Sequence, residues 1–270
     1  MNQRNQITRR EMLRIGGLSL LLSPWSRAAE GEAGKFDFTV VNDTHYVDAM
    51  CRPWHEAAAA AMRESAPKAV FCAHVGDVAD AGDAVACATI KEIYGSVTER
   101  LYVVPGNHDY IRDTDRSGYD AAFPGQLNYV FQHMGWQFLA LDTTQGTQFD
   151  QTDISSTTLA WLDETAPKLD LGMPTFVFTH FPLGEGAEYR PRNADAVVSR
   201  LERLNVRWIH NGHWHGESIR KAGKLTASTS RCCARLRSNR DGSALKGWYV
   251  YRAEVDGKLS RRFAENPKAK

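Results

Sequence analysis

The chain has 270 residues, of which 43% are hydrophobic and 24% are charged, and its formal net charge is +1. This length allows one large α/β domain or two small ones, and the composition is ordinary for a globular protein. No apolar run reaches the roughly 18 to 20 residues that a membrane helix needs, so the sequence predicts no membrane span.

The first 28 residues have the layout of a signal peptide. Basic residues come first, at Arg4, Arg9, Arg10 and Arg14. An apolar stretch over 15–22 follows, and Ser26 and Ala28 are small residues where a signal peptidase reads them. Residues 8–14 also resemble a twin-arginine export signal, with Met12 where Phe is commoner. We expect an exported protein, periplasmic or extracellular; the alternative is a cytosolic amphipathic leader helix.

Removal of this segment would change the charge balance. The remaining chain would hold 28 basic and 31 acidic residues, a net charge of −3. A broad nucleic-acid surface needs a clearly basic face, so a nucleic-acid partner is not expected. One local basic cluster remains and is interpreted as a solvated loop: Arg231, Arg235, Arg237 and Arg240.

After this segment, apolar runs of strand length alternate with helix-like segments. In chain order, strands are expected over 36–41, 69–74, 101–104, 137–141, 175–178 and 206–209, and helices over 54–63, 84–94, 157–168 and 194–204. Three late strands are expected over 225–228, 247–255 and 258–263, the last two joined by a turn at Asp256 and Gly257. This order predicts one α/β domain over 36–265, with a mixed sheet or two packed sheets.

Five polar segments follow the carboxyl ends of these strands. They are NDTHY (42–46), GDVAD (76–80), GNHD (106–109), THFP (179–182) and GHWH (212–215). Ligands bind at that edge in open α/β sheets. Imidazole, carboxylate and amide groups suit borderline or hard divalent metals, and these groups are too many for one tetrahedral zinc. The set favours two metals that share a carboxylate.

Each segment taken singly has a simpler interpretation. Asp43, Asp77 and Asn107 could be turn or cap residues. His213 and His215 are two apart and would face the same way on an extended strand, whether or not they bind metal. The joint occurrence of all five segments makes the simple interpretations less attractive. Four further histidines fit no ligand position: His55, His74, His133 and His210.

In this order, the five segments resemble the calcineurin-like metallophosphoesterase superfamily over residues 43 to 215. Its pattern is D-x-H, G-D-x-x-D, G-N-H-D/E, a lone His and G-H-x-H. The resemblance implies a two-sheet α-β-β-α sandwich. It also implies one metal on Asp43, His45 and His215, a second on Asn107, His180 and His213, and Asp77 as the bridge. His108 would face the substrate and Asp80 would orient His108.

The resemblance implies two divalent ions as cofactors, with Mn, Fe(II) and Zn all open. Asp80 stands where purple acid phosphatases place a tyrosine, so an iron(III) centre is not expected. A hydroxide held between the metals would attack phosphorus in line, and His108 would give a proton to the leaving oxygen. Trp214, between two ligands, is expected to point away from the metals.

The substrate is predicted more coarsely, as a small-molecule phosphate ester. Residues 141–144, 159–162 and 179–182 resemble the branch of cyclic-nucleotide and glycerophosphodiester phosphodiesterases, which favours a phosphodiester. The alternatives are a phosphomonoesterase and, in another class, a non-catalytic metal-binding scaffold. Arg190 and Arg192 could reach a substrate phosphate, although ordinary exposure is the preferred interpretation. The sequence leaves the oligomeric state open.

Overall fold

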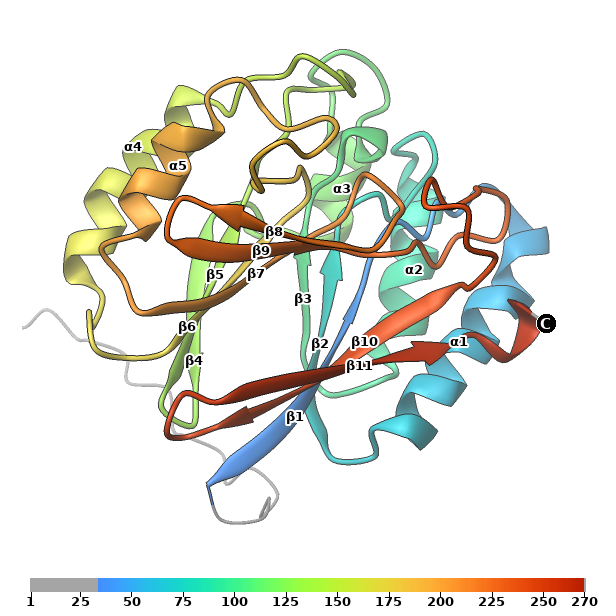
Figure 1. Ribbon diagram of the computed structural model, residues 1–270. Helices are drawn as coiled ribbons and strands as arrows, with labels where there is room; N and C mark the ends of the chain where they lie inside the picture. The colour runs from blue at the N-terminus through green and yellow to red at the C-terminus, as the bar shows by residue number, and fades with distance from the viewer. Residues whose placement is uncertain (1–33, 270) are drawn as a thin grey trace, which may run out of the picture. The chain divides into compact units, whose positions relative to one another are not determined.

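The computed structural model describes residues 34–269, so the predicted signal segment over 1–28 lies outside the described residues. The described chain builds two sheets (Figure 1). Among these residues, no helix is both long and apolar enough to cross a membrane.

The first sheet has five strands in the order β11-β10-β1-β2-β3. They are β1 (Lys35–Val41), β2 (Ala69–Val75), β3 (Leu101–Val104), β10 (Gly247–Glu254) and β11 (Leu259–Glu265). The strands β1, β2 and β3 are parallel, and the β10–β11 hairpin joins β1 in antiparallel fashion. The carboxyl ends of β1, β2 and β3 therefore share one edge.

The second sheet has six strands in the order β4-β5-β6-β7-β9-β8. They are β4 (Tyr129–His133), β5 (Trp136–Leu141), β6 (Thr175–Thr179), β7 (Val206–Asn211), β8 (Ser218–Ala222) and β9 (Leu225–Thr229). The strands β5, β6, β7 and β9 are parallel, while β4 and β8 close the two edges in antiparallel fashion.

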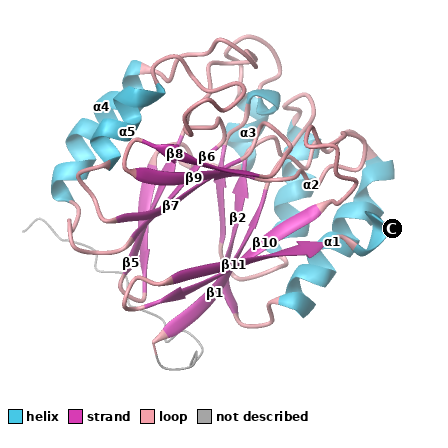
Figure 2. Ribbon diagram, viewed as in Figure 1, coloured by secondary structure: helices cyan, strands magenta, loops and turns pink. Residues whose placement is uncertain are grey.

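Helices cover the outer faces of both sheets. They are α1 (Arg52–Ser65), α2 (Ala84–Gly95), α3 (Ser117–Ala122), α4 (Ser156–Thr165) and α5 (Ala194–Leu201). Figures 1 and 2 show α1 and α2 on one side of the strands and α4 and α5 on the other. Each pair packs against its own sheet through a separate apolar cluster. The predicted α-β-β-α sandwich is confirmed.

A third apolar cluster fills the space between the sheets and is rich in aromatic rings. Phe38 on β1 stacks on Phe71 of the same sheet at 4.8 Å between ring centroids. The same ring meets Phe138 and Phe176 of the other sheet edge-on, at 5.5 and 5.2 Å. Such pairs add to the free energy of area burial and hold the two sheets together.

One α-helix, two strands and three short 3-10 helices of the described residues were not predicted: α3, β4, β8, η1 (Ala49–Cys51), η2 (Asn107–Asp109) and η4 (Pro267–Ala269). The strand β4 turns into β5 through Met134 and Gly135, both at positive φ, in a two-residue hairpin without the usual Asn-Gly signal. The strands β4 and β8 are edge strands with mixed or exposed side chains, so neither has the apolar run that marked the inner strands. The predicted helix over 157–168 ends its last turn as a 3-10 helix over Ala166–Lys168, which contains Pro167.

Candidate metal centre

All seven predicted ligands lie in the turns that follow parallel strands. Asp43 and His45 follow β1, Asp77 follows β2 and Asn107 follows β3, all in the first sheet. His180 follows β6, and His213 and His215 follow β7, in the second sheet. The sandwich brings these two sheet edges together, and all of these side chains except Asn107 form two clusters that share Asp77.

The first cluster contains Asp43, His45, Asp77 and His215, whose candidate ligand atoms all lie within 4.8 Å of one another. The Nε2 atoms of His45 and His215 are 3.0 Å apart. Nitrogens about 2.0–2.1 Å from one metal at the tetrahedral angle would lie about 3.3 Å apart. The two imidazoles are therefore close to the spacing that a common ion requires.

The second cluster contains Asp77, His180 and His213. Nε2 of His180 lies 3.2 Å from Nδ1 of His213 and 3.4 Å from Oδ1 of Asp77. The other carboxylate oxygen of Asp77, Oδ2, lies 3.4 Å from Nε2 of His45 in the first cluster. Asp77 thus offers one oxygen to each cluster, which is the arrangement of a bridging carboxylate.

Asn107 adds an amide oxygen to this region. Its Oδ1 is buried and has no hydrogen-bond partner among the described residues. A buried polar atom without a partner is costly, so such an atom in a native structure calls for a ligand or water. A metal ion on Oδ1 would remove this cost, and the donor set suits a hard or borderline divalent ion.

Three of the four imidazoles are held by a hydrogen bond on the outer side of the ring. Nδ1 of His180 donates to the carbonyl of Val75 at 2.9 Å, and Nε2 of His213 donates to the carbonyl of Phe149 at 2.8 Å. Nδ1 of His45 donates to Oδ1 of Asp80 at 3.0 Å. The thiol of Cys232 lies beside His215. Metal-binding histidines are commonly fixed in this way, with the second nitrogen left for the ion.

The backbone at five of the ligand positions is not extended, whereas an extended strand end was expected for His213 and His215. Asp43, His45, Asp77, His213 and His215 have φ values of 50°, 44°, 53°, 67° and 49°. This left-handed region costs a non-glycine residue of order 1–3 kcal/mol, and such strain gathers at functional sites. His213 and His215 therefore face neighbouring clusters because the turn bends, and not because residues two apart on a strand share a face.

At two positions of the motifs, any residue larger than glycine would clash with a ligand side chain. A Cβ on Gly106 would lie 2.1 Å from Oδ1 of Asp77. A Cβ on Gly76 would lie 2.4 Å from Nδ1 of His180, and Gly76 has a φ of 83°. The glycines thus leave space for the carboxylate and the imidazole that approach the backbone.

The charges of the cluster stabilise one another. Burial raises the pKa of Asp77, but His180, His108 and His45 outweigh burial and hold it well below its usual range. Burial lowers the pKa of His180, but Asp77 raises it to about 9. Burial also lowers the pKa of His215, and Asp43 raises it to about 10. The buried carboxylates therefore stay ionised and require positive charge beside them, which protons or metal ions can supply.

His108 lies beside the clusters, half-buried, with its ring centroid 4.7 Å from that of His45. Its Nδ1 donates to the main-chain carbonyl of Asp80 at 2.9 Å. Nε2 is thus the ring atom free to exchange a proton in the cavity. Asp80 does contact His108, but through its carbonyl; its carboxylate accepts hydrogen bonds from His45 and Arg237.

An open cavity of about 220 Å³ lies over both clusters. Four of its lining residues were not predicted: Phe149, Tyr189, Arg237 and Arg240. The two arginines belong to the basic cluster that was interpreted as a solvated loop; Arg235 and Arg240 are exposed and Arg237 is partly buried, but Arg237 and Arg240 line the cavity as well. Asn239 and Lys246 are buried nearby, so this segment is not a free loop.

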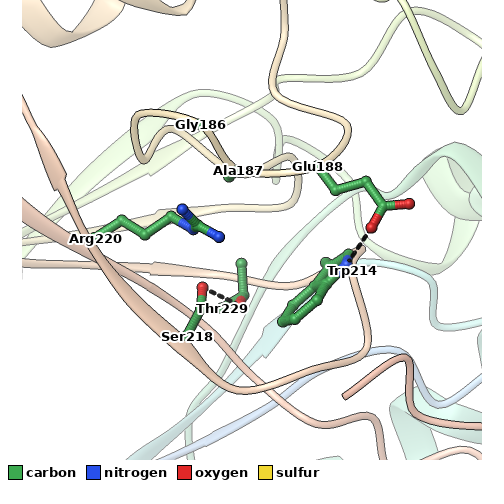
Figure 3. Close-up of a pocket in the computed structure, with 7 residues that line it drawn as sticks. All are labelled: Gly186, Ala187, Glu188, Trp214, Ser218, Arg220 and Thr229. Atoms are coloured by element: carbon green, nitrogen blue, oxygen red, sulfur yellow. Dashed lines mark hydrogen bonds between the residues drawn. The ribbon is translucent and has the colours of Figure 1, made fainter. Parts of the chain in front are cut away.

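Trp214 lines a neighbouring cavity (Figure 3) and is not among the residues that line the cavity over the two clusters. Its Nε1 donates to Oε2 of Glu188 at 2.8 Å. Arg190 and Arg192 do not reach the clusters, because they pair with Asp195 and Asp153. His210 bonds to Tyr251 and Ser230 and is a satisfied core residue.

Solved structures resemble this fold. A purple acid phosphatase from yellow lupin has 11% identity and a TM-score of 0.62, covering 90% of this chain. The chain spans about half of that enzyme, 53%. GAP50 of Plasmodium, described as the anchor in the inner membrane complex, has 13% identity and a TM-score of 0.59, covering 88% of this chain and 86% of that one.

Phosphopantetheinyl hydrolase from Mycobacterium tuberculosis has 14% identity and a TM-score of 0.53, covering 74% of this chain and 90% of that one. At such identities these likenesses show the fold alone. No curated protein matches the sequence. The family model "Calcineurin-like phosphoesterase" matches residues 36–217, which include every predicted ligand. The chain therefore belongs to the calcineurin-like phosphoesterase family.

Proposed function

We propose that the protein hydrolyses small phosphodiesters with two divalent metal ions. The observation that carries this proposal is the sharing of Asp77 by two ligand clusters, beside His108, at the floor of one open cavity. Asp43, His45 and His215 would hold one ion, and Asn107, His180 and His213 the other. Bound there, the two cations would lower the pKa of water towards about 7 and offset negative charge on phosphate oxygens.

The chain itself supplies the proton for the leaving group. Because the carbonyl of Asp80 accepts from Nδ1 of His108, the proton donated to an ester oxygen would come from Nε2. The same hydrogen bond fixes the ring, so that little motion is needed between binding and proton transfer. The carboxylate of Asp80 also accepts from His45, so Asp80 connects His108 with the first cluster.

The diester preference rests on the sequence resemblance at residues 141–144, 159–162 and 179–182. The phosphomonoester alternative would use the same ligands and the same acid. The two alternatives differ only in whether a second ester substituent is bound.

Metal analysis combined with two chromogenic esters tests the proposal. Protein loaded with Mn, Fe(II) or Zn should bind about two ions per chain. It should hydrolyse bis(p-nitrophenyl) phosphate with a higher kcat/KM than p-nitrophenyl phosphate. The reverse preference would favour the phosphomonoesterase. Two bound ions without hydrolysis of either ester would favour a non-catalytic metal-binding scaffold.

We also propose export by a twin-arginine signal, on the strength of residues 1–28 alone. Replacing Arg9 and Arg10 by lysine should leave the protein in the cytoplasm of a bacterial host, while the unchanged chain is recovered outside it. Equal export of both chains would contradict the proposal.

A further inference from the structure

The loop between β9 and β10, residues 230–246, lies beyond the part of the chain that the family model matches. We refer to it as the arginine loop, because Arg237 and Arg240 extend from it into the cavity over the metal clusters. The cationic part of the cavity is thus built by residues outside the shared phosphoesterase region.

The arginine loop is fixed in place, although it has no helix or strand. The buried side chain of Asn239 accepts from the amide of Cys232 at 3.0 Å and donates to the carbonyls of Ser243 and Leu245. The buried Lys246 donates to the Cys232 sulfur at 2.9 Å and to the carbonyl of Arg237. These internal bonds hold the loop in one shape.

The same loop is also bound to the metal centre. The amide of Arg240 donates to the carbonyl of His215 at 3.0 Å, and the amide of Cys233 donates to the carbonyl of Asn42, next to Asp43. The backbone that carries Arg237 and Arg240 is therefore held at a fixed place relative to the ligands. Such preorganisation reduces the entropy cost of binding an anion.

The two arginines differ in position and charge balance. Arg237 is the inner one: its Nε donates to Oδ1 of Asp80 at 3.0 Å, and this carboxylate offsets its charge. Arg240 is exposed at the rim, with its guanidinium 5.0 Å from the ring centroid of Tyr189. Within residues 34–269, Arg240 forms no ion pair; Glu188 is near enough for Arg240 to lower the pKa of its carboxyl, but this carboxylate accepts from Trp214, so the guanidinium is open to a ligand.

With two metal ions bound, the positive charge of the cavity would exceed the negative charge of a simple diester and a hydroxide. Two divalent cations with Asp43 and Asp77 carry about +2, which a hydroxide and a diester monoanion already balance. The Arg237–Asp80 pair adds nothing, and Arg240 adds one positive charge at the rim. An additional anionic group on the substrate would meet this charge.

We propose that Arg240 binds a second anionic group of the substrate, separate from the scissile phosphate. This inference rests on the proposed function and narrows its substrate to phosphodiesters that carry a further phosphate or carboxylate near the scissile linkage. Arg240 would then determine specificity.

Two p-nitrophenyl esters test this proposal: thymidine 5′-(p-nitrophenyl phosphate) and the same compound with a 3′-phosphate. They share the scissile linkage and leaving group, so any general loss of catalysis cancels in the ratio of their kcat/KM values. The metal-loaded wild type should prefer the 3′-phosphorylated ester by about 10- to 100-fold, as expected for charge-assisted hydrogen bonds. Arg240→Gln should bring the ratio to about 1, and Arg240→Lys should restore part of it.

Arg235→Gln is the matched control, since Arg235 is exposed on the same loop and does not line the cavity. This variant should keep the wild-type ratio. A wild-type ratio near 1 would overturn the proposal, as would an unchanged ratio in Arg240→Gln. An equal loss of activity towards both esters would place Arg240 on the scissile phosphate and would also overturn it. Failure of the wild type to hydrolyse either ester would count against the proposed function instead.

Discussion

At the scale of single residues, the centre depends on how each imidazole is anchored. Backbone carbonyls fix His180 and His213, so the choice of ring nitrogen is set by the fold. His108 follows the same rule with a different outcome: its free nitrogen faces the cavity beside the clusters. Under the proposed function, a histidine would thus serve as ligand or as acid according to whether its free nitrogen lies within a cluster or beside it.

The first prediction concerns His108. His108→Ala should keep both metal ions, because this side chain belongs to neither proposed ligand set. Activity on bis(p-nitrophenyl) phosphate should fall by roughly 10²–10⁴-fold, the usual contribution of an acid–base group. Metal content by elemental analysis and steady-state kinetics would check both parts. Loss of metal in this variant would mean that His108 is a ligand.

The second prediction separates the two histidines of the GHWH segment. His213→Ala should weaken the site that contains His180, whereas His215→Ala should weaken the site that contains Asp43 and His45. Titration of each metal-free variant with Mn, followed by calorimetry, should show one lost site in each case. Loading each variant with two spectroscopically distinct metals would show whether the two variants lose different sites. The same lost site in both variants would rule out the division of labour.

At the scale of elements, much of the fold follows from hydrophobic periodicity. The inner strands β1, β2, β5, β6 and β7, together with β3 at the edge of the first sheet, appear as apolar runs that end in polar turns. The edge strands β4 and β8 have mixed or exposed side chains instead, which is why they were missed. The ligand positions were readable because parallel strands share their carboxyl edge. Arg240 was not readable, since only tertiary contacts place the arginine loop above the centre.

The third prediction concerns a turn glycine. Gly106→Ala would force a Cβ to within 2.1 Å of the Asp77 carboxylate, so Asp77 must move. Because Asp77 serves both clusters, both metal sites should weaken together, and overpacking should cost about 1–3 kcal/mol of unfolding free energy. Thermal melts and metal titration would measure these effects.

Gly95→Ala is the control for this substitution. Gly95 ends α2 with nothing within 4 Å of the added Cβ. This variant should bind metal as the wild type does and should be slightly more stable, since alanine lowers the entropy of the unfolded chain. If Gly106→Ala behaves like Gly95→Ala, the close approach of Asp77 does not constrain this turn.

At the scale of the whole molecule, the sandwich buries three histidines that belong to neither of the two metal-ligand clusters. His55, His74 and His210 are each almost fully buried, and burial lowers the pKa of each to about 3. They bond to hydroxyl groups of Tyr94, Thr44 and Tyr251, respectively. The cores on both sides of the first sheet therefore contain neutral imidazoles that resist protonation.

This burial predicts loss of stability in mild acid. In the unfolded chain each histidine takes up a proton near pH 6.5, whereas in the folded protein it does so only near pH 3. Each one therefore contributes stability that is complete above about pH 6.5 and falls by about 1.4 kcal/mol per pH unit below it. Burial raises the pKa of Asp109 to about 7. Asp109 therefore acts in the opposite direction and offsets the stability loss of about one of the three histidines.

His180 and His215 do not disturb this pH window. Their pKa values are raised to about 9 and 10, so their contribution in the metal-free protein is complete below pH 6.5 and is lost only as the pH rises towards those values. Between pH 6.5 and 5, the wild type without metal should thus lose net stability. His210→Gln, which can still bond to Tyr251 and Ser230, should lose about 2 kcal/mol less over the same range.

Guanidinium unfolding of the metal-free protein at pH 6.5 and 5.0 measures this difference. The substitution has its own structural cost, but this cost is the same at both pH values and cancels in the comparison. Parallel pH profiles for His210→Gln and the wild type would mean that His210 is protonated in the folded protein. In that case the hydroxyls of Tyr251 and Ser230 would have to accept its two protons, and the core between the sheets would contain a buried charge.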